Sequence, residues 1–372
     1  MTAPLVLLSA GGTGGHLFPA ESLANALKAS GIRVVLVTDK RANAYAGAFP
    51  AEEIIEIPSA TPSGRSLPQM AKAALLLGKS ILKAIPVIRR LKPAVAVGFG
   101  GYPTVPPLLA ASFVGVPVAI HEANGVLGRA NRLLSRRASL IATGFEATKG
   151  VPAGDAGQRV HTGNPVRPAV LEAAKIAYPA LSKESRVQLL VFGGSQGARV
   201  MSDIVPLAIE KLPAELRARL SICQQAREED CQRVRETYRR LNVACEVEPF
   251  FKDLPRRIAE AHLIISRSGA STVAELSVIG RPSILVPLPG SLDQDQAANA
   301  KSLADIGAAI VLPQVEFTPE RLATEIQSLL AEPERLTRAA ASAKSAGISD
   351  AAERLAEAVL KLASTTQNGI KS

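Results

Sequence analysis

The chain has 372 residues and a formal net charge of +10, and 47% of its residues are apolar. This length suits about two domains, and the apolar content is sufficient for two hydrophobic cores. The three cysteines, Cys223, Cys231 and Cys245, form no C-x-x-C pair, and the four histidines are scattered. The composition therefore excludes a disulfide-built secreted domain and a cysteine- or histidine-rich metal centre, and it fits a reducing cytoplasm.

The positive charge is concentrated in the first half of the chain. Residues 1–165 contain 17 Lys and Arg against 8 Asp and Glu, whereas residues 166–372 contain 26 against 25. Between Glu56 and Glu122 there is no acidic residue, while seven residues are basic. The first half is therefore expected to meet an anionic partner or surface. A nucleic acid is not expected to be that partner, because aromatic residues for base stacking make up only 3% of the chain.

The first apolar segment, residues 4–9, lacks a basic leader and predicts a strand rather than a signal peptide. Residues 93–120 carry no charge and are numerous enough to span a bilayer, but prolines and glycines divide them into short pieces. We expect a strand at 94–97, a turn, a helix at 105–114 and a strand at 117–120. Buried parallel strands are expected to be apolar on both faces.

Short β-branched runs alternate with helical patterns along the chain, which is typical of parallel βαβ units. The strands predicted in the first half are 4–9, 33–38, 54–57, 94–97, 117–120 and 140–142. Those predicted in the second half are 188–192, 220–223, 244–247, 263–266, 283–286 and 309–312. The helices predicted between them include 17–29, 199–212, 228–241 and 296–306.

This alternation predicts an α/β protein with one domain at 1–165 and a second at 166–350. Each half begins with an apolar strand, a glycine cluster and a helix, and the GNPVRP segment near Gly163 interrupts the regular structure. An alanine-rich amphipathic helix at 351–363 is expected to pack back on the first domain.

Three glycine-rich turns follow predicted strands, at Gly11–Gly15, Gly98–Gly101 and Gly193–Gly197. Glycines permit positive φ and close approach of backbone N–H groups to a ligand, and the following helix N-terminus favours an anion. Asp39 stands where nicotinamide-binding folds keep a ribose-binding acid. However, the first turn departs from G-x-G-x-x-G and the chain has no P-loop motif, which disfavours an oxidoreductase and a P-loop enzyme.

The helix predicted around residues 72–90 has two different faces. At 100° per residue, one face is basic and consists of Lys72, Lys79, Lys83 and Arg90. The opposite face is apolar, is expected to pack on the sheet, and consists of Ala74, Leu77, Ile81, Ile85 and Ile88. Leu75, Leu76 and Leu82 fall near the basic side. A solvated crossover helix is one interpretation; leucines beside lysines favour a bilayer surface.

Two further features leave alternatives open on the residues alone. In SRSGASTVAE, Thr272 and Glu275 have the spacing of a helix capping box, which the spacing favours, but Glu275 can equally accept the hydroxyls of a ribose. His16 and His121 each come after a predicted strand. Each is a candidate general base or a structural hydrogen-bonding group.

Taken together, the motifs resemble those of the MurG family of bacterial cell-wall glycosyltransferases. The motifs are AGGTGGHLFPA, GFGGYPTVPP, HEANGVLGRANR, GNPVR, GGSQGAR, SRSGASTVAE and a D-x-x-Q-x-x-NA element at 293–300. They occur in the family's order nearly from end to end. The resemblance implies the GT-B fold, with two Rossmann-like domains whose parallel sheets face an interdomain cleft. It assigns the acceptor and membrane to domain 1–165 and UDP-N-acetylglucosamine to domain 166–350.

The resemblance also implies a reaction. The family transfers N-acetylglucosamine from UDP-N-acetylglucosamine to the C4 hydroxyl of the muramoyl sugar of lipid I, with inversion, and forms lipid II for peptidoglycan. The resemblance implies that no metal and no cofactor is required; the D-x-D string at 293–295 belongs to the D-x-x-Q-x-x-NA element. The implied location is peripheral, on the cytoplasmic face of the bacterial inner membrane. The alternative is a related GT-B transferase that acts on another membrane lipid, such as diacylglycerol; HEAN and GNPVR argue against it.

The family's site residues carry over to matching positions in this chain. The resemblance implies His16 as the base, with His121 and Glu122 as alternatives. The implied UDP-N-acetylglucosamine site comprises Thr13, Gly14, Gly15, Asn124, Arg167, Ser195, Phe251, Ala270, Ser271, Thr272, Val273, Ala274, Glu275 and Gln296. Within it, Arg167 and Ser195 would hold the diphosphate, Phe251 the uracil and Glu275 the ribose. The membrane and acceptor surface would comprise Lys72, Leu75, Leu76, Lys79, Leu82, Lys83 and Arg90.

Overall fold

The computed structural model describes residues 3–11, 14–40, 49–58, 67–152, 157–194, 197–291 and 294–369. The chain divides into two compact units. Unit 1 comprises residues 1–167 and 349–372, and unit 2 comprises residues 168–348. The division falls just after Arg167, and the C-terminal segment belongs to the first unit.

Unit 1 contains a parallel sheet with the strand order β3-β2-β1-β4-β5-β6-β7. Its strands are β1 (Leu5–Ser9), β2 (Arg33–Thr38), β3 (Glu53–Glu56), β4 (Val95–Gly98), β5 (Val118–Glu122), β6 (Leu140–Thr143) and β7 (Gln158–His161). The central strands β1, β4, β5 and β6 are buried along their whole length. This explains why β1, β4 and β6 read as almost entirely apolar runs, as does β5 up to Ile120.

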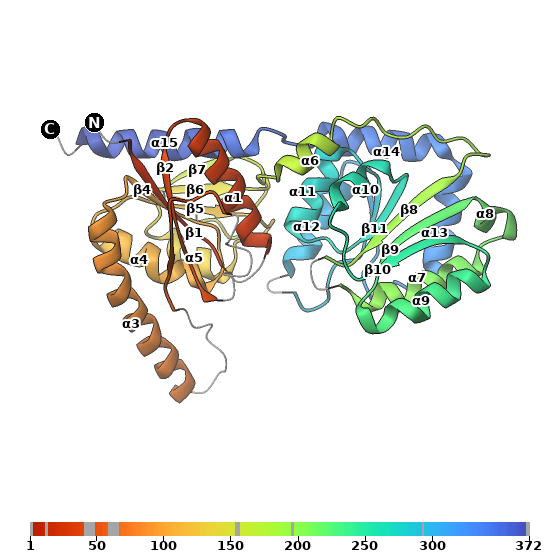
Figure 1. Ribbon diagram of the computed structural model, residues 1–372, viewed down its shortest axis with the longest axis horizontal. Coiled ribbons are helices and arrows are strands. Elements are labelled where there is room, and N and C mark those ends of the chain that lie inside the picture. Colours follow the sequence, from red (N-terminus) through yellow and green to blue (C-terminus); the bar gives the residue numbers. More distant parts are fainter. Residues whose placement is uncertain are drawn as a thin grey trace. The chain divides into compact units, whose positions relative to one another are not determined.

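Helices cover both faces of this sheet (Figure 1). One face packs against α1 (Gly14–Ala29) and α15 (Ala351–Gly369) through residues such as Leu23 and Leu355. The other packs against α3 (Leu67–Leu91), α4 (Val105–Phe113) and α5 (Arg129–Ser135). Alternate β1 residues serve the two faces, with Val6 and Leu8 on one and Leu7 on the other, because side chains alternate along a strand.

Unit 2 contains a parallel sheet with the strand order β10-β9-β8-β11-β12-β13. Its strands are β8 (Val187–Phe192), β9 (Leu220–Gln225), β10 (Ala244–Glu248), β11 (Leu263–Ser266), β12 (Ser283–Leu285) and β13 (Ala309–Val311). From β8 the strands progress to one edge of the sheet through β9 and β10, and to the other edge through β11, β12 and β13. The order of the strands therefore reverses beside β8. Ligands of doubly wound sheets bind at the carboxyl ends of the strands near such a reversal.

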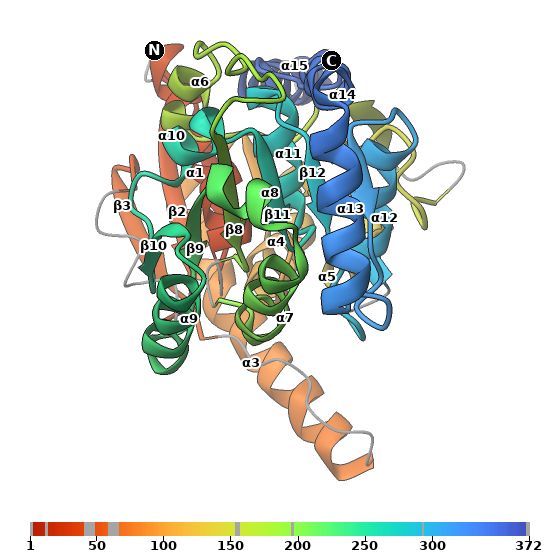
Figure 2. The same cartoon turned by 90° about the vertical axis from the view of Figure 1, so that its right-hand side faces the viewer.

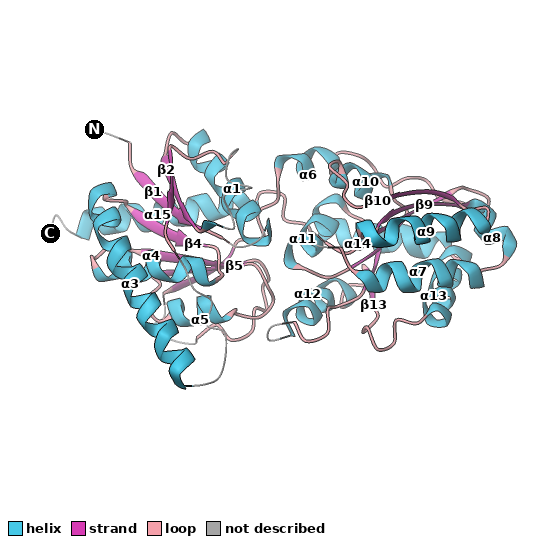
Figure 3. Ribbon diagram, turned by 60° about the horizontal axis from the view of Figure 1, so that its bottom comes forward, coloured by secondary structure: helices cyan, strands magenta, loops and turns pink. Residues whose placement is uncertain are grey.

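The helices of unit 2 also lie on both faces of its sheet, as Figures 2 and 3 show. One hydrophobic core lies under α7 (Arg199–Lys211), α9 (Glu228–Arg240) and α13 (Pro319–Ala331). The helices α6 (Pro168–Ala173), α10 (Leu254–Glu260), α11 (Ala270–Ile279) and α12 (Asp295–Ala304) belong to the opposite side, where α14 (Pro333–Ser345) packs on α11. The short α8 (Ala214–Arg219) leads directly into β9.

The predicted α/β architecture is confirmed in both halves, with strand ends shifted by one to two residues. Three differences matter. The edge strand β7 was not predicted, because only two of its four residues are even partly buried, so its sequence lacks an apolar run. β5 extends to Glu122, so His121 and Glu122 lie within the strand rather than after it. The C-terminal helix continues to Gly369.

The basic helix α3 is longer than its apolar contact with the sheet. Its C-terminal half packs through Ala84 and Ile88, while its N-terminal half extends beyond the sheet in Figures 1 and 2. Ala74 is therefore exposed, contrary to the expectation that it packs on the sheet. Of the predicted basic face, Arg90 pairs with Glu53 of β3 at 2.7 Å. No helix within the described residues is both long and apolar enough to cross a membrane.

The docking of α15 on unit 1 can be tested with Leu355→Ala. Leu355 is fully buried in the core shared with α1, so its truncation should lower the free energy of unfolding by about 2–5 kcal/mol. Denaturant unfolding followed by circular dichroism measures the change. Glu357→Ala, at an exposed position of the same helix, is the control and should change stability by less than about 0.5 kcal/mol. Equal effects of the two variants would show that α15 is not docked.

Candidate active site

His16 lies in the first turn of α1, rather than in the loop before it, and its side chain is half-buried. The imidazole packs against the turn after β4, where a side chain added at Gly101 would come within 3.4 Å of His16 Nε2. Gly101 has φ +76°, a conformation that favours glycine, and a Cβ atom there would require the imidazole to shift by a few tenths of an ångström. Burial lowers the pKa of His16, and the Phe99 backbone carbonyl partly opposes that shift. The imidazole is consequently neutral at neutral pH.

His121 lies close to His16 but is enclosed, with 1% of its surface exposed. Its Nε2 lies 3.2 Å from the carbonyl oxygen of Gly163, which can only accept, so Nε2 carries the proton of the neutral ring. Phe99 packs against the ring, with the centroids 5.6 Å apart. The pKa of His121 is lowered to about 4, mainly by burial and to a smaller extent by His16, while the hydrogen bond to the Gly163 carbonyl opposes the shift.

The Glu122 carboxylate is buried and accepts four hydrogen bonds. Oε1 accepts from the backbone N–H of Asn124 at 3.0 Å and from its side-chain amide at 3.3 Å. Oε2 accepts from the Gly128 N–H and from Asn131 Nδ2, both at 2.9 Å. Burial raises the pKa of Glu122, and these donors oppose the rise. The carboxylate therefore holds the 123–128 turn, including Asn124, against the end of β5.

Two buried asparagines that we did not single out complete this network. Asn131 also donates to the backbone carbonyl of His121 at 3.1 Å. Asn164, in the GNPVR segment, donates to the Ala123 carbonyl at 2.8 Å. Both occur inside quoted motifs, but nothing in their spacing distinguishes them from solvent-exposed asparagines. Beyond Asn164, the Arg167 guanidinium stacks over the ring of Phe18 of α1 at 4.5 Å.

In unit 2, the predicted uracil residue Phe251 follows β10 and is 6% exposed. Its ring is covered by the Arg257 guanidinium, 4.3 Å from the ring centroid. The glycine-rich turn after β8 begins at Gly193, and Gly194 has φ +87°. The predicted residues Thr13 and Ser195 lie outside the described residues, whereas Gly14 and Gly15 open α1.

The predicted nucleotide segment forms the first turns of α11. The N-cap is Gly269, so the capping box predicted for Thr272 and Glu275 is wrong. Thr272 is already helical because the chain enters α11 directly from the short turn after β11. Ala270, Val273 and Glu275 are buried, whereas Ser271, Thr272 and Ala274 are half-buried.

Gln296 lies in the first turn of α12, and its side chain is held by the loop after β12. Its Oε1 accepts from the Leu288 N–H at 3.0 Å, and its backbone carbonyl accepts from Ser268 Oγ at 2.8 Å. Asn299 donates to the Ser268 carbonyl at 3.1 Å. These contacts connect the start of α12 to the turn that opens α11.

Arg267 also holds the loop after β12, from a buried position. It was not identified as a site residue from the sequence. Its guanidinium donates to the carbonyls of Val286 and Pro287 and, at 2.6 Å, to Gln314 Oε1. It is 8% exposed, and burial lowers its pKa.

The predicted site residues thus gather at the carboxyl end of each sheet. In unit 1, His16, His121, Glu122 and Asn124 come together. In unit 2, Phe251, residues 270–275 and Gln296 follow successive strands. Among the described residues, no group of three or more His, Cys, Asp or Glu side chains is placed to hold a metal ion. The basic residues of α3 belong to a different part of unit 1 from this cluster.

Two family models match the two units of the chain. The glycosyltransferase family 28 N-terminal domain matches residues 6–143, and the glycosyltransferase family 28 C-terminal domain matches residues 188–355. The first model spans β1 to β6 of the unit 1 sheet, and the second spans β8 to β13 of the unit 2 sheet.

Similar proteins cover nearly the whole chain. A UDP-N-acetylglucosamine–N-acetylmuramyl-(pentapeptide) pyrophosphoryl-undecaprenol N-acetylglucosamine transferase of Methylobacterium sp. (strain 4-46) is 63% identical over 361 residues, 97% of each chain. The transferase of the same name from Bradyrhizobium diazoefficiens is 56% identical, over 97% of this chain and 99% of its own. The crystal structure of Acinetobacter baumannii MurG is 31% identical, with a TM-score of 0.78 over 96% of this chain and 99% of that one.

The identity, the coverage and the paired parallel sheets agree with one another, and the chain belongs to glycosyltransferase family 28, with the GT-B fold and within the MurG family.

Proposed function

We propose that this chain transfers N-acetylglucosamine from UDP-N-acetylglucosamine to the C4 hydroxyl of the muramoyl sugar of lipid I, forming lipid II. Relatives that are 56–63% identical carry the name of this transferase. The observation that carries the proposal is the neutral, half-buried imidazole of His16, which lies among family motifs at the carboxyl end of the unit 1 sheet. Such a group can accept a proton from an attacking hydroxyl.

The reaction is proposed to be a single displacement with inversion at the anomeric carbon. The acceptor hydroxyl loses its proton to His16 as its oxygen attacks C1 of the donor sugar, and the bond from C1 to the UDP oxygen breaks. Inversion follows because the attacking and leaving oxygens occupy opposite sides of that carbon. UDP departs with the bonding electron pair.

The geometry favours His16 over the two alternative bases. His121 is enclosed, and its Nε2 proton is directed at the Gly163 carbonyl. Glu122 is buried and already accepts four hydrogen bonds. We therefore assign Glu122 the positioning of the 123–128 turn, from which Asn124 would reach the donor sugar.

The donor is proposed to lie at the carboxyl end of the unit 2 sheet. Glu275 would accept the ribose hydroxyls, residues 270–274 would cover the nucleotide, and Phe251 would line the uracil. Gln296, whose side chain is fixed by the Leu288 N–H, would contact the sugar hydroxyls. Arg167, the turn containing Ser195, and the positive end of a helix would stabilise the leaving diphosphate without a metal ion. Thr13, Gly14 and Gly15 are also proposed to contact the donor.

The N-terminal half of α3 is proposed to bind the anionic membrane surface that carries lipid I. Leu75 and Leu82 are 62% and 69% exposed, and Leu76 is 40% exposed. Lys72, Lys79 and Lys83 lie on the same part of the helix and have no ion-pair partner among the described residues. Arg90 lies at the other end, where Glu53 neutralises it. A peripheral location on the cytoplasmic face of the inner membrane would follow.

His16→Ala should lower kcat for transfer of labelled N-acetylglucosamine to a lipid I analogue by about 10²–10⁴-fold, because the base is lost. His161→Ala, on β7, is the control and should retain activity. The pKa of His16 is lowered from its ordinary value of 6.5, so the imidazole loses its proton at a pH below 6.5. In the unsubstituted protein kcat/KM should therefore be flat at neutral pH and fall in acid. A His16→Ala variant of undiminished kcat would exclude this residue as the base.

Strict chelation should leave transfer unchanged, because the proposed charge stabilisation uses Arg167 and backbone dipoles. The same assay is run with excess EDTA after the protein has been dialysed against chelator. Complete loss of activity that Mg²⁺ or Mn²⁺ restores would contradict a metal-independent reaction.

Replacing Lys72, Lys79 and Lys83 by Gln should weaken binding to anionic vesicles at low salt by about 10²-fold, at about 1 kcal/mol for each basic residue. Cosedimentation with phosphatidylglycerol vesicles measures the partition. Substitution of three exposed lysines of unit 2, Lys175, Lys183 and Lys252, is the matched control for net charge. The proposed surface is wrong if the two triple variants lose binding equally.

A further inference from the structure

A single buried side chain joins two turns at the carboxyl end of the unit 2 sheet. Gln225 ends β9 and is 6% exposed. Its Oε1 accepts from the Gly193 N–H at 3.2 Å, and its Nε2 donates to the Pro249 carbonyl at 3.1 Å. Because β9 lies between β8 and β10, the side chain spans from the turn after β8 to the turn after β10.

The first of these turns is closely packed at Gly193. A Cβ atom at this glycine would lie 2.2 Å from the Ala198 nitrogen, so the two ends of the turn are in contact. Gly197 N–H donates to the Gly194 carbonyl at 3.0 Å and closes the turn further. The hydrogen bond from Gly193 to Gln225 therefore anchors the described part of this turn at its first residue.

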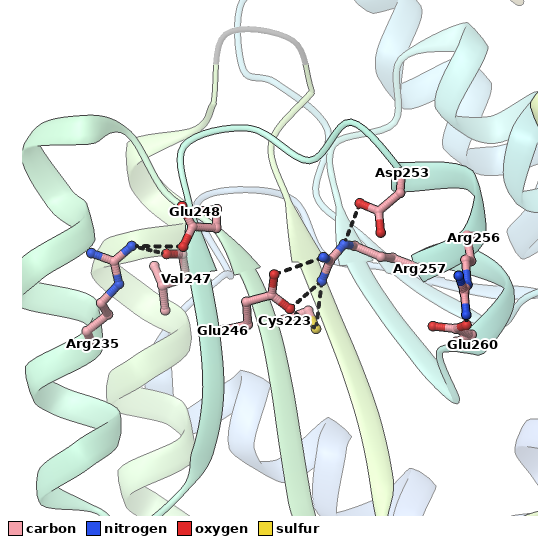
Figure 4. Close-up of polar contacts among 9 residues, drawn as sticks. All are labelled: Cys223, Arg235, Glu246, Val247, Glu248, Asp253, Arg256, Arg257 and Glu260. Carbon is pink, nitrogen blue, oxygen red and sulfur yellow. Dashed lines mark hydrogen bonds and ion pairs between the residues drawn. The ribbon is translucent and has the colours of Figure 1, made fainter.

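The second turn is braced from the side of α10, as Figure 4 shows. Arg257 donates two hydrogen bonds to the Glu246 carboxylate, at 2.6 and 2.8 Å, and one to Asp253 at 2.8 Å. The same guanidinium lies over the ring of Phe251. These contacts hold residues 249–253 between the end of β10 and α10. The Pro249 carbonyl that accepts from Gln225 therefore belongs to a turn whose position is fixed.

We propose that Gln225 is a positioning residue for the sugar-nucleotide donor. It fixes the spacing between the glycine-rich turn, which takes the diphosphate, and the 249–253 turn, which takes the base. This inference rests on the proposed function, because that function assigns the two turns to one ligand. UDP spans both turns and needs their spacing, whereas uridine contacts only the second. A preset spacing favours binding because the ligand does not have to order the turns itself.

The chain supplies a matched control in the preceding residue. Gln224 is completely buried, and its side chain lies on the opposite face of β9, where it donates to the Met201 carbonyl and accepts from the Tyr238 hydroxyl. It has the same side chain and similar burial as Gln225, but it connects only α7, β9 and α9. Substitution of Gln224 therefore shows the effect of removing a buried glutamine that has only a structural role.

The experiment compares Gln225→Met with Gln224→Met in the full-length protein. Calorimetry measures the Kd of UDP and the Kd of uridine, and denaturant unfolding measures stability. Gln225→Met should raise the Kd of UDP about tenfold, as expected when one buried hydrogen-bonded link is lost, with uridine changed by less than about twofold. Gln224→Met should reduce stability and leave the ratio of the two Kd values unchanged.

Gln225→Asn provides a second variant if the methionine variant does not fold. It keeps the amide but is one methylene shorter, so it cannot reach both turns, and it should change the ratio in the same direction. An unchanged ratio in the Gln225 variants, or an equal change in Gln224→Met, would overturn the inference alone. Failure of the unsubstituted protein to bind UDP would overturn the proposed function, and the inference with it.

Discussion

Unit 1 is organised around a buried carboxylate that has no cationic partner among the described residues. Transfer of a charged group from water into the protein is costly unless hydrogen bonds compensate for the lost hydration. Glu122 receives that compensation from four N–H groups that lie on the turn after β5 and at the start of α5. The shape of this turn is therefore tied to the carboxylate. The shape in turn fixes Asn124, leaves the Ala123 carbonyl facing Asn164, and leaves the His121 carbonyl facing Asn131.

In unit 2, neutral amide side chains and one arginine hold the turns at the carboxyl ends of the strands. Parallel strands end in turns that make no regular hydrogen bonds with one another, so side chains have to connect them. Gln225 connects the turns after β8 and β10, and Asn299 and Ser268 connect α12 to the turn after β11. Arg267 binds the carbonyls of the loop after β12. Gln225 belongs to β9 and Asn299 to α12, whereas Arg267 and Ser268 lie in the turn after β11.

The distribution of charge also differs between unit 1 and unit 2. In unit 2, arginines such as Arg233, Arg235 and Arg257 pair with neighbouring carboxylates, which accounts for the near balance of charge in this half. In unit 1, the lysines at the N-terminal end of α3 stand apart from the acidic residues of the described chain. An uncompensated positive field beside exposed leucines is suited to an anionic membrane surface, where charge and apolar burial act together.

The sequence alone determined the α/β architecture of both halves. Apolar runs and glycine clusters are local patterns, and for this reason the succession of strands along the chain and the three glycine clusters after β1, β4 and β8 could be predicted. The unpredicted β7 marks the limit of this approach, since an edge strand with little burial has no apolar pattern.

Tertiary structure alone decided which polar residues support the site. Thr272 and Glu275 have the spacing of a capping box, yet the helix begins at Gly269, because the end of β11 sets where α11 starts. Ala74 has the periodicity of a core residue, yet the sheet ends before reaching it. Gln224 and Gln225 are identical neighbours in sequence, and only the two faces of β9 separate a core residue from a link between turns. A pairing between distant segments leaves no local pattern, so burial and contact had to assign these roles.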